Sequence, residues 1–259
     1  MSNPDGAFVW YELMTTDAPA AEAFYRGVVG WGSRDASPPG MAYTALLAGD
    51  SAVAGLLTLP PPALAGGARP VWIGYVAVDD VDAYADRFAK AGGAVHRAPA
   101  DIPGVGRFAM VADPQGAPLA LFKPFEGMEA QPPVVDRPGA VAWRELIAAD
   151  AQAAFDFYAG LFGWTKSRVF DMGAFGAYQL FAYGGGGEDV GGMMNKPPSV
   201  PVPFWTFYFQ VDGIGAAIER LQAGGGTLIN GPHQVPTGSW IAQGLDPQGA
   251  LFSLVSPQA

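Results

Sequence analysis

The chain has 259 residues, half of them hydrophobic, and its 14 Lys and Arg against 24 Asp and Glu give a net charge of −10. That charge repels phosphate backbones and anionic lipid surfaces, so nucleic acid and membranes are poor candidate partners. The absence of cysteine excludes disulfides, thiolate metal sites and a cysteine nucleophile. Because the N-terminus does not resemble a signal peptide and no apolar run could span a bilayer, we expect a cytoplasmic protein.

The first predicted elements are a strand over residues 8–15 and a helix directly after it. Asp17 offers a carboxylate that can cap the helix N-terminus, and Gly30 is placed to end the helix. Four apolar side chains fall on one face of this helix: Ala21, Phe24, Tyr25 and Val28. Short strands are then predicted over residues 43–48 and 53–59.

The same plan follows once more along the chain. A strand over residues 72–78 precedes Asp79 and Asp80, either of which can cap a second helix, and Gly92 is placed to end it. Its apolar face consists of Val81, Tyr84, Ala85 and Phe88. The carboxylates crowded at this helix start favour its dipole, so we interpret them as capping residues and not as metal ligands. Strands over residues 108–112 and 119–123 are among the three that follow this helix in a second βαβββ unit.

The second half of the chain repeats the first at an offset of about 133 positions, which we read from internal self-similarity. The matched pairs include Trp10 and Trp143, Glu12 and Glu145, Asp17 and Asp150, Trp72 and Trp205, and the Asp-Pro-Gln-Gly segments at 113–116 and 246–249. Between the copies, residues 126–138 carry Pro, Gly and charge without periodicity and are predicted to be a linker. The domains are therefore predicted at residues 1–125 and 139–259.

A single βαβββ unit leaves one face of its sheet open, and two such units can cover these faces together. We therefore predict an α+β protein with two tandem domains, each made of two paired βαβββ units whose curved sheets enclose a cleft for a small molecule. Because a duplicated chain can pair its own halves, either a monomer or a homodimer is compatible with this plan.

These motifs resemble the vicinal oxygen chelate superfamily, which includes glyoxalase I, bleomycin-resistance proteins and extradiol dioxygenases. The resemblance covers nearly the whole chain and looks like that of two-domain, glyoxalase-like members. It is carried by the following residues, present in both copies: Phe24-Tyr25 and Phe157-Tyr158, Gly30-Trp31 and Gly163-Trp164, and the two Asp-Pro-Gln-Gly turns.

The resemblance implies a divalent metal held by His and Glu side chains on paired strands. In this chain the matching positions carry other residues: Trp10 and Trp143 in the first strands, Ile73 and Thr206 in the second units, Ala120 and Ser253 in the last strands, and no carboxylate within 53–57 or 190–194. The two histidines, His96 and His233, are not equivalent in the repeat and are interpreted as surface residues. We therefore predict no metal and no other cofactor.

Glu12 and Glu145 are the candidate catalytic residues. Side chains alternate along a strand, so Glu12 shares a face with Trp10, and Glu145 with Trp143. A carboxylate desolvated in an apolar cleft has a raised pKa and could act as a general base. Alternatively, each Glu accepts hydrogen bonds from its neighbours and holds the strands in place.

The same alternation predicts the ligand pocket, whose residues are Trp10, Tyr75, Trp143, Thr206, Tyr208, Gln210 and Ser253. The tryptophans are either rigid platforms for a planar ligand or filling for a space that a metal site once occupied. The cleft of the second copy is the more polar, so we expect that copy to bind ligand if only one does. The run Gly184–Gly187 lies between two strands and is predicted to form a hairpin turn.

Two functions remain open at this point. The first is a protein that binds or sequesters a small organic molecule, as expected for a bleomycin-resistance-like protein without the chelated metal. The second is an enzyme, either a glyoxalase-type lyase or a metal-independent isomerase or lyase that uses Glu12 or Glu145 as general base. The fold alone does not decide between them, because function depends on the site.

Overall fold

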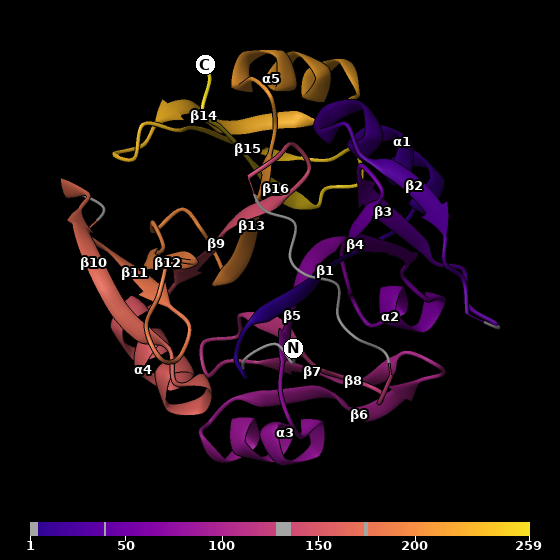
Figure 1. Ribbon diagram of the computed structural model, residues 1–259, viewed down its shortest axis with the longest axis vertical. Coiled ribbons are helices and arrows are strands. Elements are labelled where there is room, and N and C mark those ends of the chain that lie inside the picture. The colour runs from indigo at the N-terminus through magenta and orange to yellow at the C-terminus, as the bar shows by residue number, and fades with distance from the viewer. Residues whose placement is uncertain (1–4, 39, 128–135, 174–175) are drawn as a thin grey trace. The chain divides into compact units, whose positions relative to one another are not determined.

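The computed structural model describes residues 5–38, 40–127, 136–173 and 176–259 (Figure 1). The first repeat contains two βαβββ modules. Module 1 consists of β1 (Phe8–Thr15), α1 (Ala18–Val29), β2 (Gly32–Asp35), β3 (Thr44–Ala48) and β4 (Ser51–Thr58), and the short helix α2 (Pro61–Ala65) follows it. Module 2 consists of β5 (Val71–Ala77), α3 (Val81–Lys90), β6 (Ala94–Ile102), β7 (Gly106–Ala112) and β8 (Pro118–Pro124).

The second repeat has the same content. Module 3 consists of β9 (Val141–Ala148), α4 (Ala151–Phe162), β10 (Thr165–Asp171), β11 (Ala177–Ala182) and β12 (Gly191–Asn195). Module 4 consists of β13 (Phe204–Gln210), α5 (Ile214–Ala223), β14 (Thr227–Gln234), β15 (Trp240–Leu245) and β16 (Leu251–Ser256). The prediction of four βαβββ units is therefore confirmed.

The strands form two eight-stranded mixed sheets, one for each repeat. Their orders are β2-β3-β4-β1-β5-β8-β7-β6 and β10-β11-β12-β9-β13-β16-β15-β14. In each module the first strand pairs with the last in parallel, and the strands after the helix pair antiparallel. This arrangement confirms the predicted α+β class.

Helix boundaries follow the capping residues that the sequence offers. The carboxylates of Asp17, Asp80 and Asp150 each accept a hydrogen bond at 3.0 Å from the backbone N–H three residues later. Gly30 and Gly163 end α1 and α4 with a positive φ, which glycine adopts without strain. The predicted caps at Asp17 and Asp80 and the helix end at Gly30 are thus confirmed.

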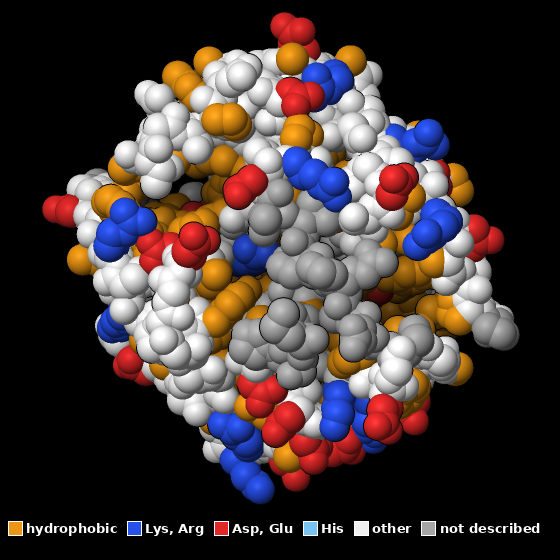
Figure 2. All heavy atoms as spheres, viewed as in Figure 1, with side chains coloured by type: hydrophobic (Ala, Val, Ile, Leu, Met, Phe, Trp, Pro, Cys, Tyr) orange, Lys and Arg blue, Asp and Glu red, His pale blue; other side chains and the backbone are white. Residues whose placement is uncertain are grey.

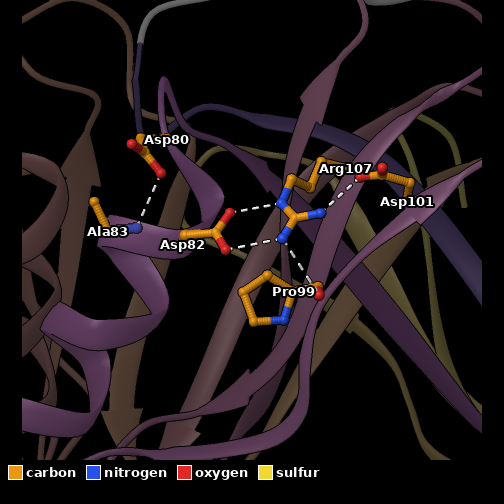
Figure 3. Close-up of polar contacts among 6 residues, drawn as sticks. All are labelled: Asp80, Asp82, Ala83, Pro99, Asp101 and Arg107. Atoms are coloured by element: carbon orange, nitrogen blue, oxygen red, sulfur yellow. Dashed lines mark hydrogen bonds and ion pairs between the residues drawn. The ribbon is translucent and has the colours of Figure 1, made fainter.

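The acidic residues at the start of α3 have separate structural roles (Figure 3). Asp80 caps the helix, whereas Asp82 pairs with Arg107 at 2.5 Å, and Arg107 also reaches Asp101 on β6 at 2.7 Å. These ion pairs hold the pKa of the Asp82 carboxyl below its ordinary value, chiefly through the hydrogen bond from Arg107. The expected capping role is confirmed for Asp80, whereas Asp82 is held by Arg107.

The chain divides into two compact units, and each takes one module from each repeat. Unit 1 comprises Met1–Val9, Gly74–Gln131 and Trp143–Trp205, and unit 2 comprises Trp10–Ile73, Pro132–Ala142 and Thr206–Ala259. In unit 1, α3 lies along β6, β7 and β8 and contacts α4 (Figure 1). In unit 2, α5 lies along β14, β15 and β16 and contacts α1. Modules of different repeats therefore share a core.

Aromatic side chains fill both cores. In unit 2, the Tyr25 ring of α1 packs edge-on against Trp72 and Phe252, with centroids 5.3 and 5.2 Å apart. In unit 1, the Tyr158 ring of α4 stacks on Trp164 at 5.3 Å and meets Trp205 edge-on at 5.5 Å. Such pairs add to the stability that burial of the rings already provides.

Charged side chains are mixed on the molecular surface. On the face drawn in Figure 2, Lys and Arg side chains lie among Asp and Glu side chains. The basic side chains therefore do not form a continuous patch on that face. Within the part of the chain that the structure describes, no helix is both long enough and apolar enough to span a membrane.

Candidate functional site

Trp10 and Glu12 on β1 belong to a compact polar cluster together with Tyr43. The indole N–H of Trp10 donates a hydrogen bond to the Tyr43 hydroxyl at 2.9 Å, and that hydroxyl in turn donates to the Glu12 carboxylate. Gly55 on β4 lies opposite Glu12 in the strand register, and a Cβ there would overlap the Tyr43 hydroxyl. We call Trp10, Glu12, Tyr43 and Gly55 the first Trp-Tyr-Glu cluster.

The second repeat contains the same arrangement. Trp143 donates a hydrogen bond to the Tyr178 hydroxyl at 2.7 Å, Glu145 pairs in register with Gly192, and a Cβ on Gly192 would overlap the Tyr178 ring. These four residues form the second Trp-Tyr-Glu cluster. Tyr43 directly precedes β3, whereas Tyr178 lies in β11, and the segments that lead to them from the preceding helices differ in length, so their offset is 135 positions and not 133. The sequence showed their correspondence but not their contact with the tryptophans.

The environment of the first cluster controls which groups carry protons. Burial is the main reason why the pKa of Tyr43 lies well above its ordinary value of 10.0, and the nearby Glu12 carboxylate raises it further. The Glu12 side chain is 7% exposed, and that of Glu145 is 8% exposed. At neutral pH the Tyr43 hydroxyl is therefore protonated, and its O–H is the donor in the hydrogen bond to Glu12. Trp10 and Trp143 remain partly exposed beside these buried groups.

Contacts in unit 2 show which strand face carries the first cluster. Tyr11 meets Phe207 edge-on with centroids 4.9 Å apart, so Tyr11 points toward the aromatic core. Because neighbouring residues of a strand point to opposite faces, Trp10 and Glu12 lie on the face away from that core. The same alternation places Thr206 and Tyr208 on the β13 face opposite Phe207.

Polar side chains cross β13, β16 and β15 in one row. Tyr208 lies opposite Ser253, and Ser253 lies opposite Gln243 in the strand register. The Gln243 amide N–H donates to the Tyr208 hydroxyl at 3.2 Å, and the hydroxyls of Thr206 and Ser253 are 2.8 Å apart. We call Tyr208, Ser253 and Gln243 the polar row. Gln243 is not among the predicted pocket residues, although its place opposite Ser253 follows from pairing the last two strands.

The equivalent row of module 2 is apolar except for its tyrosine. Tyr75 lies opposite Ala120, and Ala120 lies opposite Met110. Tyr75 is buried, and its ring meets Phe122 at a centroid distance of 6.1 Å. We call Tyr75, Ala120 and Met110 the apolar row. The two repeats thus present different chemistry at matching strand positions.

Gln210, the two histidines and the glycine run, which the sequence also singled out, lie at strand ends, on exposed strands and in a turn. Gln210 ends β13 and is partly exposed, and its backbone N–H donates to the Ala140 carbonyl. His96 on β6 and His233 on β14 are both exposed, which confirms that they are surface residues. The glycine run 184–187 connects the antiparallel strands β11 and β12, as expected for a hairpin turn.

The residues at the expected metal-binding positions do not fit a divalent metal. Thr206 and Ser253 carry neutral hydroxyl groups in place of imidazole or carboxylate donors, and the Trp10 indole nitrogen has no free lone pair to coordinate a cation. Zinc, manganese and iron sites need several imidazole or carboxylate donors close together. Across the described residues, no group of three or more His, Cys, Asp or Glu is placed to hold a metal.

Comparison with known families gives one match that covers both repeats. The family is described as the Glyoxalase/Bleomycin resistance protein/Dioxygenase superfamily, and it matches residues 7–121 and 140–254. The two matched segments contain the first and the second Trp-Tyr-Glu cluster, respectively.

Full-length relatives share about a third of the sequence. The chain is 36% identical to "Putative glyoxylase CFP32" of Mycobacterium tuberculosis over 251 residues, which cover 96% of this chain and 94% of that protein. It is 33% identical to "Anthracycline biosynthesis protein DnrV" of Streptomyces peucetius over 261 residues, which cover 96% and 93% of the two proteins.

Solved structures resemble the chain at the level of the fold. The Mn(II)-bound glyoxalase from Novosphingobium aromaticivorans has a TM-score of 0.64 and 17% identity and covers 99% of this chain and 83% of its own. The 2,3-dioxygenase LapB from Pseudomonas sp. KL28 has a TM-score of 0.65 and 11% identity, with 99% and 94% covered. At these identities the likeness concerns the fold and not the site.

Proposed function

Since the chain belongs to the Glyoxalase/Bleomycin resistance protein/Dioxygenase superfamily, we propose that it binds a small organic molecule without the chelated metal of that superfamily. The observation that carries the proposal is the duplicated Trp-Tyr-Glu cluster, whose tryptophans, Trp10 and Trp143, occupy the positions at which the resemblance leads us to expect the first metal ligand. In each copy a partly exposed indole is fixed by a tyrosine hydroxyl beside a buried carboxylate. A tryptophan held in this way is a rigid surface for a flat ligand.

The position of the tyrosines supports this proposal. Gly55 and Gly192 lie within the segments where the family's remaining ligand is expected, and the Tyr43 and Tyr178 side chains take the space above them. Because the same replacement occurs in both repeats, it is a property of the scaffold and not of one altered copy. We propose that Trp10, Tyr75 and Trp143 supply apolar contact area, and that Thr206, Tyr208, Gln210 and Ser253 supply the polar contacts.

The named relatives are compatible with a ligand of this kind. One is named for anthracycline biosynthesis, and a rigid indole surface suits a flat ligand with several rings. We propose a neutral polycyclic aromatic compound as the ligand class, because the net charge of −10 disfavours an anionic ligand.

Equilibrium dialysis against fluorene, a neutral three-ring hydrocarbon, tests the proposal. We expect the protein to retain fluorene, and Trp10→Leu or Trp143→Leu to weaken retention several-fold by removing contact area. Trp240→Leu is the matched control, because Trp240 is a partly exposed tryptophan of β15 outside both clusters. Unchanged retention in both cluster variants would contradict the proposed site. Stoichiometric Zn, Ni, Fe or Mn in the purified protein would contradict the metal-free proposal.

A second candidate function is a glyoxalase-type lyase or a metal-independent isomerase or lyase, with Glu12 or Glu145 as general base. The burial of Glu12 and Glu145, which are 7% and 8% exposed, favours it, because a general base works best where it is shielded from water. One relative also carries the name of a putative glyoxylase.

Solvent-proton exchange distinguishes the enzyme from the binding protein. A thiohemiacetal of a 2-oxoaldehyde is incubated in D₂O, and deuterium uptake at its carbon acid is followed by NMR. If either glutamate is the base, Glu12→Gln or Glu145→Gln abolishes the uptake while fluorene retention is preserved. Uptake that persists in the double variant would exclude both carboxylates as the base.

A further inference from the structure

The polar row of module 4 has a fixed orientation. Asn230 on β14 donates from its amide to the Gln243 carbonyl oxygen at 3.0 Å, so the Gln243 amide nitrogen is directed to the Tyr208 hydroxyl. The side chain of His233 contacts the Asn230 amide oxygen at 2.9 Å. This chain of contacts leads from an exposed histidine to a tyrosine that is 3% exposed. The Gln243 amide has two N–H groups, of which the contact with Tyr208 uses one.

Beside this row, the Thr206 and Ser253 hydroxyls are buried against each other. Two hydroxyls carry two protons, and the hydrogen bond between them uses only one. Within the described part of the chain, no acceptor is found for the second hydroxyl proton of this pair. A buried O–H without an acceptor lowers stability, and an acceptor oxygen brought next to it removes that cost.

The apolar row shows that the fold does not need these polar groups. At matching positions, module 2 has Met110 for Gln243 and Ala120 for Ser253. Ile73 takes the place of Thr206, and Arg97 that of Asn230. Both modules nevertheless form the same parallel pairing of first and last strands. The polar groups of module 4 therefore call for an explanation beyond strand pairing.

We infer that the polar row, together with Thr206, is a subsite for the carbonyl oxygen of an aromatic ligand, whereas Met110 and Ala120 of the apolar row offer that oxygen no hydrogen-bond donor. Oriented amide and hydroxyl donors beside one another recognise an acceptor oxygen. Gln243 is partly exposed, so the row reaches the surface at β15. The inference rests on the proposed ligand-binding function and adds the chemical group that decides selectivity.

The test compares 9-fluorenone with fluorene, which share three rings and differ in one carbonyl. Equilibrium dialysis measures the affinity ratio for the two compounds. We expect wild type to prefer 9-fluorenone about tenfold, as two neutral hydrogen bonds would give. In the double variant Gln243→Met/Ser253→Ala, which introduces the residues of the other repeat with nearly the same volumes, the ratio should fall to about one.

The reciprocal variant Met110→Gln/Ala120→Ser is the matched control, because it introduces the polar residues into the apolar row and leaves the polar row intact. Its affinity ratio for 9-fluorenone over fluorene should be at least that of wild type. If the double variant does not fold, Gln243→Met alone serves for the test, because a substitution at this partly exposed position disturbs the core less. A ratio that is the same in wild type and in the Gln243 variants would overturn the inference but leave the proposed function intact. If wild type retains neither compound, the proposed function fails and the inference fails with it.

Discussion

The Tyr25 hydroxyl, in the first repeat, donates a hydrogen bond to the Asp246 carboxylate, in the second, over an oxygen–oxygen distance of 3.1 Å. In the opposite sense, the hydroxyl of Tyr158 in the second repeat donates to the carboxylate of Asp113 in the first, also at 3.1 Å. All four side chains are buried, and each tyrosine hydroxyl also accepts a hydrogen bond from a tryptophan indole. A buried Trp-Tyr-Asp chain therefore joins the two repeats within each compact unit.

Removal of either tyrosine hydroxyl should destabilise the protein. Tyr25→Phe leaves the Trp72 indole N–H and one carboxylate oxygen of Asp246 without this partner, and an unsatisfied buried group costs about 1–3 kcal/mol. Tyr158→Phe should have a similar effect in the other unit. Urea unfolding measures the loss of unfolding free energy. A decrease of less than about 0.5 kcal/mol in both variants would show that these chains contribute little.

The buried aspartates should make stability depend on pH in a defined direction. Burial, partly offset by backbone hydrogen bonds and by Tyr25, raises the pKa of Asp246 above its ordinary value of 3.8. A raised pKa in the folded state means that the folded protein binds the proton more tightly than the unfolded chain. Its contribution to stability is therefore complete below pH 3.8 and is lost as the pH rises through the folded-state pKa.

The variant Asp246→Asn isolates this contribution, because it cannot titrate. The difference in unfolding free energy between wild type and Asp246→Asn should increase as the pH is lowered from neutral toward 3.8. Asp113→Asn should behave in the same way, because burial also raises the pKa of Asp113. Urea unfolding at a series of pH values measures both differences. Differences that stay constant or shrink on acidification would contradict the direction assigned here.

Local sequence signals predicted the elements that depend on neighbouring residues. The caps at Asp17 and Asp80 and the strand over residues 8–15 require only positions close in the chain, and the structure confirms them. Outer strands such as β6 and β14 were expected from the βαβββ plan but not assigned to particular residues, because they are largely exposed and lack the apolar pattern that marks a strand.

Long-range contacts could not be predicted in the same way. The repeat identified Tyr25 and Asp246 separately, but sequence periodicity does not say which module packs against which. Tyr43 was recognised as a repeated residue, yet its hydrogen bond to Trp10 spans 33 positions and a loop of unequal length in the two copies. Alternation within a strand did place Trp10 and Glu12 on one face. To predict that Gly55 and Tyr43 join them, the register between β1 and β4 would also have to be known.

The glycines under the tyrosines should be intolerant of a side chain. A Cβ at Gly55 would overlap the Tyr43 hydroxyl, and one at Gly192 would overlap the Tyr178 ring. Gly55→Ala and Gly192→Ala should therefore displace these tyrosines, lower the unfolding free energy by about 1–3 kcal/mol and weaken fluorene retention. Unfolding measurements and dialysis test both effects.

Two helical glycines provide the matched control for these substitutions. Gly27 in α1 and Gly160 in α4 have open space where a Cβ would lie. Because glycine is a poor helix former, Gly27→Ala and Gly160→Ala should raise the unfolding free energy by up to about 1 kcal/mol each and leave retention unchanged. If the strand variants gained stability as the helix variants do, the tyrosines would not occupy the space assigned to them.

Cutting the predicted linker should not separate the repeats. A protease site inserted within residues 126–138 divides the chain into its two repeats, but each compact unit contains modules from both. Besides the tyrosine–aspartate pairs, Arg220 of α5 donates to the Val28 carbonyl of α1 at 2.9 Å, and Arg87 of α3 donates to the Leu161 carbonyl of α4 at 3.0 Å. After cleavage the fragments should elute together in size-exclusion chromatography and unfold in one transition. Fragments that elute apart under native conditions would show that the contacts across the repeats do not hold the units together.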